Sequence, residues 1–340
     1  MTKNNQQFQE FLRDEVNLNE GRLRRLETAV AAVTAYLKDH LTGYQKMEPQ
    51  GSYALRTLIK PVDDSDEYDA DIQIVMNPNP KWESKDYSLA IHRTLKQNQN
   101  YADKLRLKTR CVTIDYAGDF HLDVVPRVTI RGRHYVCNRV DNTFEETDGT
   151  GFRDWFNDKN RITGGNLKRA VRLLKYLRDH KNNYSVKSIL LTTLAGNTIR
   201  PTDKGTEAVS TVADTLVTVL TRMDDYLQQN PYMPQIENPV LPGETFNRHW
   251  DQEKYTNFRK RVHSHALTAR NAKAESSNEK SIKIWQELFG EEFGKNASGG
   301  SGDGGGSGSS SRPSTSAAAG ATSGLGATAG SRRNEAQGFG

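Results

Sequence analysis

The chain of 340 residues is poor in cysteine, has no long hydrophobic run and is only 35% hydrophobic. Its two cysteines, Cys111 and Cys137, provide neither a disulfide framework nor, by themselves, a zinc site. No apolar run approaches the roughly 18 residues of a membrane-spanning helix. The polar start, MTKNNQQFQE, does not resemble a signal peptide. We therefore expect a soluble, reduced, cytoplasmic protein with no membrane partner.

Large apolar residues are scarcest in the segment 295–340, where only Leu325 and Phe339 occur among Gly, Ser, Ala and Thr. Such a composition cannot bury enough surface to offset the entropy of ordering, so we expect a disordered tail. The tail holds four basic and two acidic residues of a chain with net charge +5, which leaves +3 for residues 1–294. This mild charge gives weak support for nucleic-acid binding, and we expect no long nucleic acid to be required.

The rest of the chain divides into a half with strands and a helical half. Periodicity predicts a long amphipathic helix over 19–41, a helical turn over 54–58 and strands over 46–48, 68–76, 105–116, 120–130 and 134–137. A helix is predicted over 86–97, and beyond Gly151 helices are predicted over 166–180, 186–194, 209–229, 246–272 and 278–289. We expect an α+β fold in which residues 1–150 form a mixed sheet with a long N-terminal helix. Residues 151–294 would form a helix bundle that closes a cleft.

Two aspartates stand out in the strand predicted over 68–76. At a period of two, Asp69, Asp71 and Gln73 point to one face and the apolar residues between them point to the other. The two carboxylates would lie about 7 Å apart along the strand. Like charges at this spacing repel each other, and a divalent cation held between them removes the repulsion. Asp-x-Asp also occurs by chance on surface strands, so a purely structural role stays open.

A third carboxylate, Asp123, lies on the strand predicted over 120–130 in the same half of the chain. Mg²⁺ is usually held by one or two carboxylates together with substrate phosphate. Two such ions about 3.5–4 Å apart stabilise the attacking and leaving oxygens of a phosphoryl transfer. We therefore expect Asp69, Asp71 and Asp123 to be catalytic residues that ligate two Mg²⁺ ions, with Mn²⁺ as an alternative. Asp123 would ligate the ion that activates the attacking hydroxyl, and it could also take that hydroxyl's proton.

The dipeptide Gly51-Ser52 lies upstream of the two aspartates, between a short strand and a helical turn. A glycine lets the backbone approach a phosphate closely, and amides at a helix start point toward it. The serine hydroxyl can add a hydrogen bond to the β- or γ-phosphate. Gly-Ser is also among the commonest loop dipeptides, so it gains meaning only beside the carboxylates.

Together these motifs resemble a known superfamily. Gly51-Ser52, Tyr68-Asp69-Ala70-Asp71-Ile72 and Leu122-Asp123-Val124-Val125 are similar to the motifs of the DNA-polymerase-β-like nucleotidyltransferases. Within that group, Val171–Arg178 and Ser185–Leu191 resemble the bacterial cGAS/DncV-like nucleotidyltransferases, relatives of the oligoadenylate synthases. The resemblance spans about residues 19 to 290. It implies an enzyme that joins ATP, and other triphosphates in some members, into cyclic oligonucleotides that serve as second messengers in CBASS antiphage defence.

The resemblance also implies nucleotide-binding residues on both sides of the cleft. Lys175 matches the lysine that contacts the donor triphosphate. Independently, Lys168, Arg172 and Lys175 follow one another at steps of four and three and form a basic helical face. Such a face is more often simply solvated, but opposite the carboxylates it suits a triphosphate. The full set of expected nucleotide-binding residues is Gln50, Gly51, Ser52, Lys175 and Ser188 or Ser185.

His121 shares a strand face with Asp123. It could act as a local base, but histidines beside a site are more often structural, and we favour the structural role.

The chain ends in Gly338-Phe339-Gly340, after a long polar stretch. In many operons of the resembled family, an E1/E2-like enzyme joins the synthase's C-terminal residue to another protein, and an accessible glycine suits that chemistry. The resemblance therefore implies Gly340 as a conjugation residue, with a HORMA-type activator as another partner. A plain linker is the alternative.

The leading hypothesis is a Mg²⁺-dependent nucleotidyltransferase that makes a cyclic di- or trinucleotide from ATP and releases pyrophosphate. A rival on the same fold makes linear 2′-5′ or 3′-5′ oligoadenylate, or transfers a nucleotide to RNA or protein. A rival from another class is a nucleotide- or RNA-binding module without catalysis. Three mutually repelling carboxylates argue against that module. The sequence does not specify the bases, ring size or linkage of a product.

Overall fold

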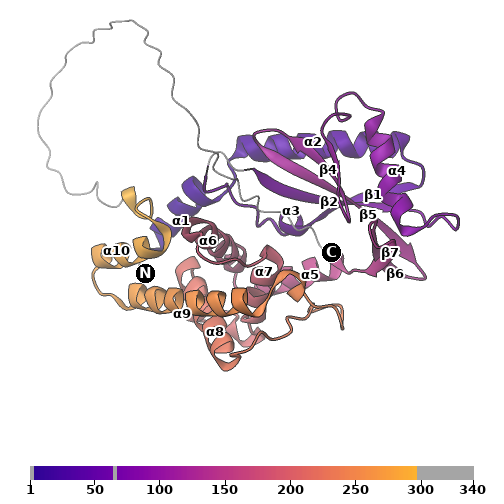
Figure 1. The fold of residues 1–340 in the computed structure, drawn as a ribbon. Helices are drawn as coiled ribbons and strands as arrows, with labels where there is room; N and C mark the ends of the chain where they lie inside the picture. Colours follow the sequence, from indigo (N-terminus) through magenta and orange to yellow (C-terminus); the bar gives the residue numbers. More distant parts are fainter. Residues whose placement is uncertain (1–3, 64–66, 297–340) are drawn as a thin grey trace, which may run out of the picture.

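The computed structural model describes residues 4–63 and 67–296, which form a mixed seven-stranded sheet beside a helical layer (Figure 1). The strands are β1 (Tyr44–Gln50), β2 (Tyr68–Met76), β3 (Leu105–Leu107), β4 (Val112–Tyr116), β5 (Phe120–Ile130), β6 (Arg133–Asn138) and β7 (Thr143–Glu146). Their order is β1-β2-β5-β4-β3, with β6 paired to β5 and β7 paired to β6. Strands β2 and β5 are parallel, whereas the other neighbouring pairs are antiparallel. This confirms the predicted α+β class with a mixed sheet.

Two helices, α2 (Glu20–His40) and α4 (Ser84–Lys96), cover one face of the sheet (Figure 1). Asn19 caps α2, because its side chain accepts a hydrogen bond from the Arg22 amide, as its position before the periodic stretch predicts. Leu26 of α2 and Ile91 of α4 belong to the same buried cluster as Ile72 of β2. The opposite face of β2 therefore points away from these helices and toward the helical layer.

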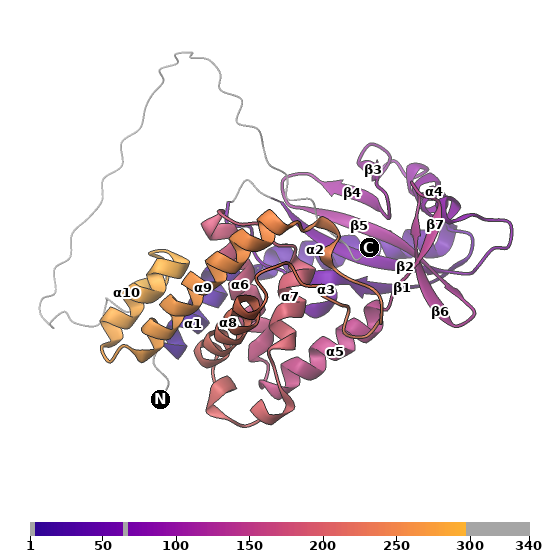
Figure 2. The ribbon, with the colours of Figure 1, turned by 60° about the horizontal axis from the view of Figure 1, so that its bottom comes forward.

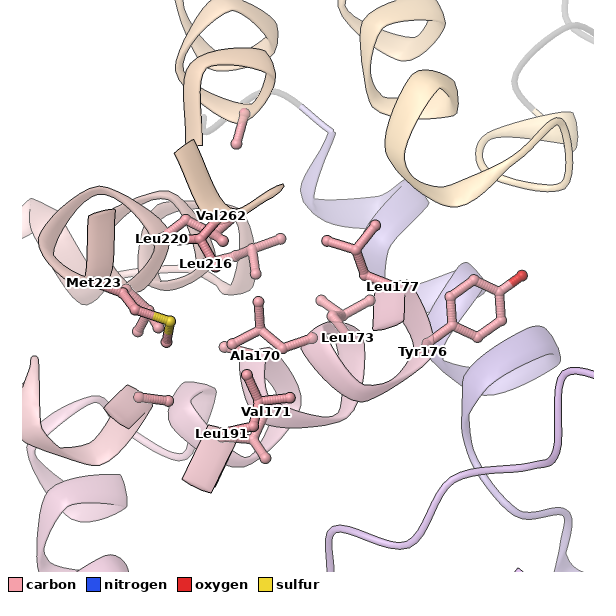
Figure 3. Close-up of a cluster of buried hydrophobic side chains, with 14 of the residues drawn as sticks. Ala170, Val171, Leu173, Tyr176, Leu177, Leu191, Leu216, Leu220, Met223 and Val262 are labelled. Carbon is pink, nitrogen blue, oxygen red and sulfur yellow. The ribbon is translucent and has the colours of Figure 1, made fainter. Parts of the chain in front are cut away.

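The helical layer packs around its own hydrophobic core. Its helices are α5 (Gly149–Ile162), α6 (Asn166–Lys181), α7 (Ser188–Asn197), α8 (Val212–Gln229), α9 (Gln252–Ala274) and α10 (Asn278–Phe289). Short helical turns are η2 (Pro201–Asp203), η3 (Glu207–Val209) and η4 (Asn247–His249). Figure 3 shows side chains of α6 such as Leu173 meeting Leu216 and Leu220 of α8 in this core. The short helix α3 (Gly51–Leu55) lies at the junction of the sheet and the helical layer in both Figures 1 and 2.

The N-terminal segment packs in the helical layer. Helix α1 (Asn5–Phe11) and the π-helical turn η1 (Leu12–Val16) bury Phe8 and Phe11 in the core of that layer. The Phe8 ring lies 4.9 Å from that of Trp285, and the Phe11 ring lies 5.1 Å from that of Tyr176. The sequence-based division assigns residues 1–150 to the sheet half, so this segment corrects it at the N-terminus. The limits at residues 150 and 151 stay a prediction.

Several elements differ from the expected ones. The strand predicted over 105–116 is two strands, because the Lys108 amide donates to the Cys111 carbonyl and closes a turn between β3 and β4. Helix α3 begins at Gly51, earlier than the helical turn predicted over 54–58. The sequence patterns do not predict strand β7 or helices α1 and α5. Strand β2 and helix α10 have the predicted bounds.

Within the described ranges, no helix is long and apolar enough to cross a membrane. The disordered tail predicted over 295–340 and the predicted conjugation residue Gly340 lie outside the described residues, apart from positions 295 and 296.

Candidate active site

The three predicted aspartates lie on one face of the sheet. In the parallel pair of β2 and β5, Asp71 lies opposite Asp123, and Asp69 lies opposite His121. Residues that are directly opposite on neighbouring strands point to the same face, and Asp69 and Asp71 share a face because side chains alternate along a strand. This face is turned away from α2 and α4, toward α3 and α6.

A row of polar residues crosses the sheet through these aspartates. Gln50 of β1 lies opposite Asp71, Thr113 of β4 lies opposite Asp123, and Arg106 of β3 lies opposite Thr113. Four adjacent strand pairs therefore place amide, carboxylate, hydroxyl and guanidinium groups side by side. A sheet face that packed only against a hydrophobic core would carry apolar side chains here.

Gly51 makes room for Asp71. Its φ of +58° lies in the left-handed region, and a Cβ at this position would lie 2.5 Å from Asp71 Oδ2. Real Cβ atoms do not approach an oxygen this closely, so any other residue would displace the carboxylate or the backbone. The glycine of Gly51-Ser52 is thus required by the position of a candidate catalytic side chain.

Burial and mutual repulsion make the aspartates reluctant to ionise. Burial first, then the charge of Asp123, raises the pKa of Asp69 to about 7. Burial and the charges of Asp123 and Asp69 raise the pKa of Asp71 well above its ordinary value. Asp71 Oδ1 and both polar side-chain atoms of Gln50 are buried without a hydrogen-bond partner. Such atoms are costly to bury and call for a polar ligand or ion.

Asp123 differs because it already has partners. The Thr113 hydroxyl donates to its Oδ1, and the ammonium group of Lys108 lies 3.4 Å from Oδ1 and 3.5 Å from Oδ2. Among residues 4–63 and 67–296, no three His, Cys, Asp or Glu side chains are arranged to hold a metal ion together. In this arrangement the third carboxylate is engaged by a lysine and a threonine.

The donor set nevertheless fits a hard divalent cation. Asp69, Asp71 and Asp123 offer carboxylate oxygens on one face, which is the ligand type that Mg²⁺ and Mn²⁺ prefer. The unpartnered Asp71 Oδ1 is an available ligand atom. A cation would also relieve the repulsion that raises the pKa values of Asp69 and Asp71.

The structure brings Lys175 together with Ser52. The ammonium group of Lys175, on α6, donates to Ser52 Oγ at 2.6 Å and to the Thr57 carbonyl at 3.1 Å. The side chain is buried, and burial followed by the charge of Arg178 lowers the pKa of Lys175 to about 7. A polar anchor from the helical layer thus reaches the segment that begins α3.

The two candidate serines that follow α6 have other partners. Ser188 Oγ accepts a hydrogen bond from Arg178 Nη1 at 3.1 Å. Ser185 is exposed, and its carbonyl accepts a hydrogen bond from Trp250 Nε1 at 3.3 Å. Neither of these hydrogen bonds involves Lys175, and the nucleotide-binding role of the two serines stays a prediction.

The basic face of α6 also extends to α3. Arg172 Nη1 donates to Asn17 Oδ1 at 2.5 Å, and burial, then the charge of Arg169, lowers the pKa of Arg172 to about 10. Burial, then the charge of Arg56, lowers the pKa of Lys168. Arg56 ends α3 in the left-handed conformation, with φ +54°. Cations therefore gather one helical turn beyond Ser52.

His121 lies outside the row, two residues along β5 from Asp123, between two carboxylates. Its Nε2 is 2.7 Å from Glu67 Oε2, and its Nδ1 is 3.0 Å from Asp115 Oδ1. These neighbours hold the ring between loop and strand and favour the structural role over that of a base.

Sequence reasoning missed Lys108, Thr113 and Arg56. Lys108 and Thr113 lie in the segment predicted as a single strand, where an interrupting turn changes the face to which each residue points. The sequence signal for Lys108 is its spacing of two residues from Arg106, which places two cations on one side of an extended segment.

Residues 1–160 match the family model of the Second Messenger Oligonucleotide or Dinucleotide Synthetase domain. The chain is 28% identical over 279 residues to the c-di-GMP synthase of Roseivirga ehrenbergii, and the match covers 71% of this chain and 72% of that protein.

Two solved structures share the fold. CdnC of E. coli MS115-1, determined with ATP, is 18% identical with a TM-score of 0.66, and the match covers 86% of this chain and 99% of that one. The cyclic AMP-GMP synthase DncV of Vibrio cholerae, determined with nonhydrolyzable GTP, is 16% identical with a TM-score of 0.68 and covers 86% of this chain and 96% of that one. The domain match and the synthase relative show a likeness to second-messenger oligonucleotide synthetases, and the chain shares the fold of CdnC and DncV.

Proposed function

We propose that the chain is a Mg²⁺-dependent synthase that makes a cyclic di- or trinucleotide second messenger from ATP and other nucleoside triphosphates. The observation that carries the proposal is the shared face of Asp69, Asp71 and Asp123, with Lys175 and Ser52 meeting beside it. The relatives named c-di-GMP synthase and cyclic AMP-GMP synthase support a cyclic product.

Asp69, Asp71 and Asp123 are the residues that would hold the metal ions. When bound, the ions would neutralise the triphosphate and help to deprotonate the attacking hydroxyl. Asp123 stands at one end of the trio and accepts the proton of the attacking 3′- or 2′-hydroxyl. The new bond forms between that oxygen and the α-phosphorus, while the bond from the α-phosphorus to the departing pyrophosphate oxygen breaks.

The residues around Ser52 are suited to hold the triphosphate. The hydroxyl of Ser52 and the ammonium group of Lys175 can turn from each other to phosphate oxygens at little cost, because both already lie at the site. Beyond them, Arg56, Lys168 and Arg172 form no ion pair with an acidic side chain in the described part of the chain. Their unneutralised charge would attract the phosphates and orient the donor.

Regulation by a protein partner is part of the proposal. CdnC has been solved in complex with a HORMA protein, which supports a HORMA-type activator for this chain. An E1/E2-like enzyme acting at Gly340 is the alternative activator. Either partner would place the enzyme in antiphage defence.

Product analysis tests the proposal against its linear rival. The purified chain is incubated with four labelled nucleoside triphosphates and Mg²⁺ or Mn²⁺, treated with phosphatase, and its products are resolved by chromatography. We expect a phosphatase-resistant product that disappears in the Asp69→Asn, Asp71→Asn double variant. The control is Asp103→Asn, because Asp103 is exposed and lies outside the row.

A phosphatase-sensitive ladder in place of the resistant product would support linear synthesis and overturn cyclisation. A resistant product of equal yield from the double variant would show that these aspartates are not the catalytic groups.

A further inference from the structure

Lys108 neutralises Asp123, the third carboxylate of the candidate site. It occupies the turn after β3, and its ammonium group lies 3.4 Å and 3.5 Å from the two oxygens of Asp123. The Lys108 side chain is 32% exposed, whereas that of Asp123 is 2% exposed. A flexible, solvent-reaching cation therefore contacts a buried carboxylate from the open side.

Other cations near the site are already held elsewhere. Arg106 Nε donates to Asp115 Oδ1 at 3.0 Å, and Lys175 donates to Ser52 and Thr57. Lys108 is thus the only cation within ion-pair distance of Asp123 in the described part of the chain. Without it, Asp123 would remain buried beside two other carboxylates with a threonine hydroxyl as its partner.

A divalent cation and Lys108 compete for the same oxygens. Lys108 lies near both oxygens of Asp123, and a metal ion that uses this carboxylate draws on the same lone pairs and the same charge. We propose that Lys108 is a positioning residue that holds Asp123 while the site contains no metal and releases it when a divalent cation binds. This inference rests on the metal site of the proposed function.

The exchange has a consequence for the order of binding. A cation that must displace Lys108 binds weakly alone and more tightly when it arrives with the negative charge of a triphosphate. Lys108 thereby couples metal binding to the presence of substrate.

Metal affinity in the absence of nucleotide tests the exchange. Mn²⁺ binding to the full chain is measured by isothermal titration calorimetry for wild type, Lys108→Met and Lys104→Met. Lys104 is exposed and close in sequence, so its variant makes the same charge change without touching Asp123. We expect Lys108→Met to bind Mn²⁺ about three- to fivefold more tightly, the size expected from removing one partly exposed ion pair, and Lys104→Met to match wild type.

Thermal unfolding gives a second, independent measurement. In EDTA, Lys108→Met should unfold at a lower temperature than wild type, because Asp123 has lost its counter-ion. Saturating Mn²⁺ should abolish that difference, because the metal ion then neutralises Asp123 in both proteins. Lys108→Gln is a second neutral variant with the same expected results.

Two results separate the possible failures. If Lys108→Met and Lys108→Gln bind Mn²⁺ like wild type and their lower unfolding temperature persists in Mn²⁺, Lys108 is purely structural and the inference is overturned. If the Asp69→Asn, Asp71→Asn variant binds Mn²⁺ as well as wild type, the metal site itself is absent and the proposed function fails with it.

Discussion

Gly51 shows how a single backbone position fixes the place of a candidate catalytic carboxylate. The left-handed φ would strain any other residue, and the added Cβ would overlap Asp71 Oδ2. Backbone strain and displacement of Asp71 are separate effects of replacing Gly51. A second glycine, Gly118, would cause backbone strain alone if it were replaced. Gly118 has φ +76°, and a Cβ added there would meet nothing within 4 Å.

We predict that Gly51→Ala loses nucleotidyl transfer by at least about a hundredfold, because the displaced Asp71 no longer lies in the row. Both Gly51→Ala and Gly118→Ala should be destabilised by about 1–2 kcal/mol from the positive φ, but Gly118→Ala should retain activity. Pyrophosphate release and urea unfolding measure the two effects. A fully active Gly51→Ala would show that Asp71 tolerates displacement.

The raised pKa of Asp69 predicts how stability depends on pH when no metal is present. The folded-state pKa of about 7 exceeds the usual value near 3.8, so the folded chain holds a proton that the unfolded chain has lost. The free energy of unfolding should therefore fall as pH rises from about 4 to about 7, by roughly 1–3 kcal/mol from this group. Urea unfolding in EDTA across this range, for wild type and Asp69→Asn, measures the effect.

Asp69→Asn should lose the part of the pH dependence that comes from Asp69 and keep the part from Asp71, whose pKa is also raised. It should be the more stable protein at pH 8 without metal. Identical pH profiles for the two proteins would mean that Asp69 ionises normally. Asp103→Asn controls for the removal of one surface carboxylate.

At the scale of elements, the site depends on a helix of one layer reaching a short helix of the other. Helix α6 buries its apolar stripe in the helical core and thereby directs Lys175 to Ser52 on α3. Its bounds were nearly predicted, because the stripe of apolar residues on α6 is regular. The helical periodicity of the sequence does not show that Lys175 reaches Ser52, because the two residues come from separate layers.

We predict that Lys175→Met lowers kcat/KM for the triphosphate by about a hundredfold, because a charge-assisted contact to phosphate is lost. Removing a buried ammonium group should not destabilise the fold strongly, because burial already lowers its pKa to about 7. The matched control is Lys181→Met on the same helix, where the ammonium group donates to the Glu287 carbonyl. Equal kcat/KM values for the two variants would contradict the phosphate contact.

The strands show where a local sequence pattern is sufficient to predict the bounds of an element and where it is not. Strand β2 was predicted with its observed bounds, because strict alternation and a buried apolar face coincide in it. The sequence does not reveal the break between β3 and β4, because Thr109 and Cys111 continue the alternation with Lys108 and Arg110 through it. The break is fixed by contacts with a distant segment, such as the hydrogen bond from the Arg139 amide to the Thr109 carbonyl.

At the scale of the whole molecule, the chain's N-terminal helix closes the core of the C-terminal layer. Phe8 is fully buried against Trp285 and Phe293. Phe8, Phe11, Leu12 and Val16 follow helical spacing, so a signal existed in the sequence, but the surrounding polar residues concealed it. Which layer the helix joins is decided by packing between segments at opposite ends of the described chain, which no local pattern encodes.

We predict that Phe8→Ala lowers the free energy of unfolding by about 3–5 kcal/mol, because it leaves a cavity between α1 and α10. Leu23→Ala is the control, because Leu23 on α2 is exposed and outside the buried core, and the substitution should cost less than about 1 kcal/mol. Urea unfolding measures both. Equal effects would indicate that α1 does not stabilise the helical layer.

The central claim is that Asp69, Asp71 and Asp123 form one catalytic face for nucleotidyl transfer, and the rate of pyrophosphate release tests it most directly. The rate is measured with each of the four triphosphates and Mg²⁺ or Mn²⁺ for wild type, Asp71→Asn, Asp123→Asn and Asp103→Asn. We expect wild type and Asp103→Asn to release pyrophosphate at the same rate, and the two row variants to be at least about a hundredfold slower. Equal, measurable rates for wild type, Asp71→Asn and Asp123→Asn would contradict the claim.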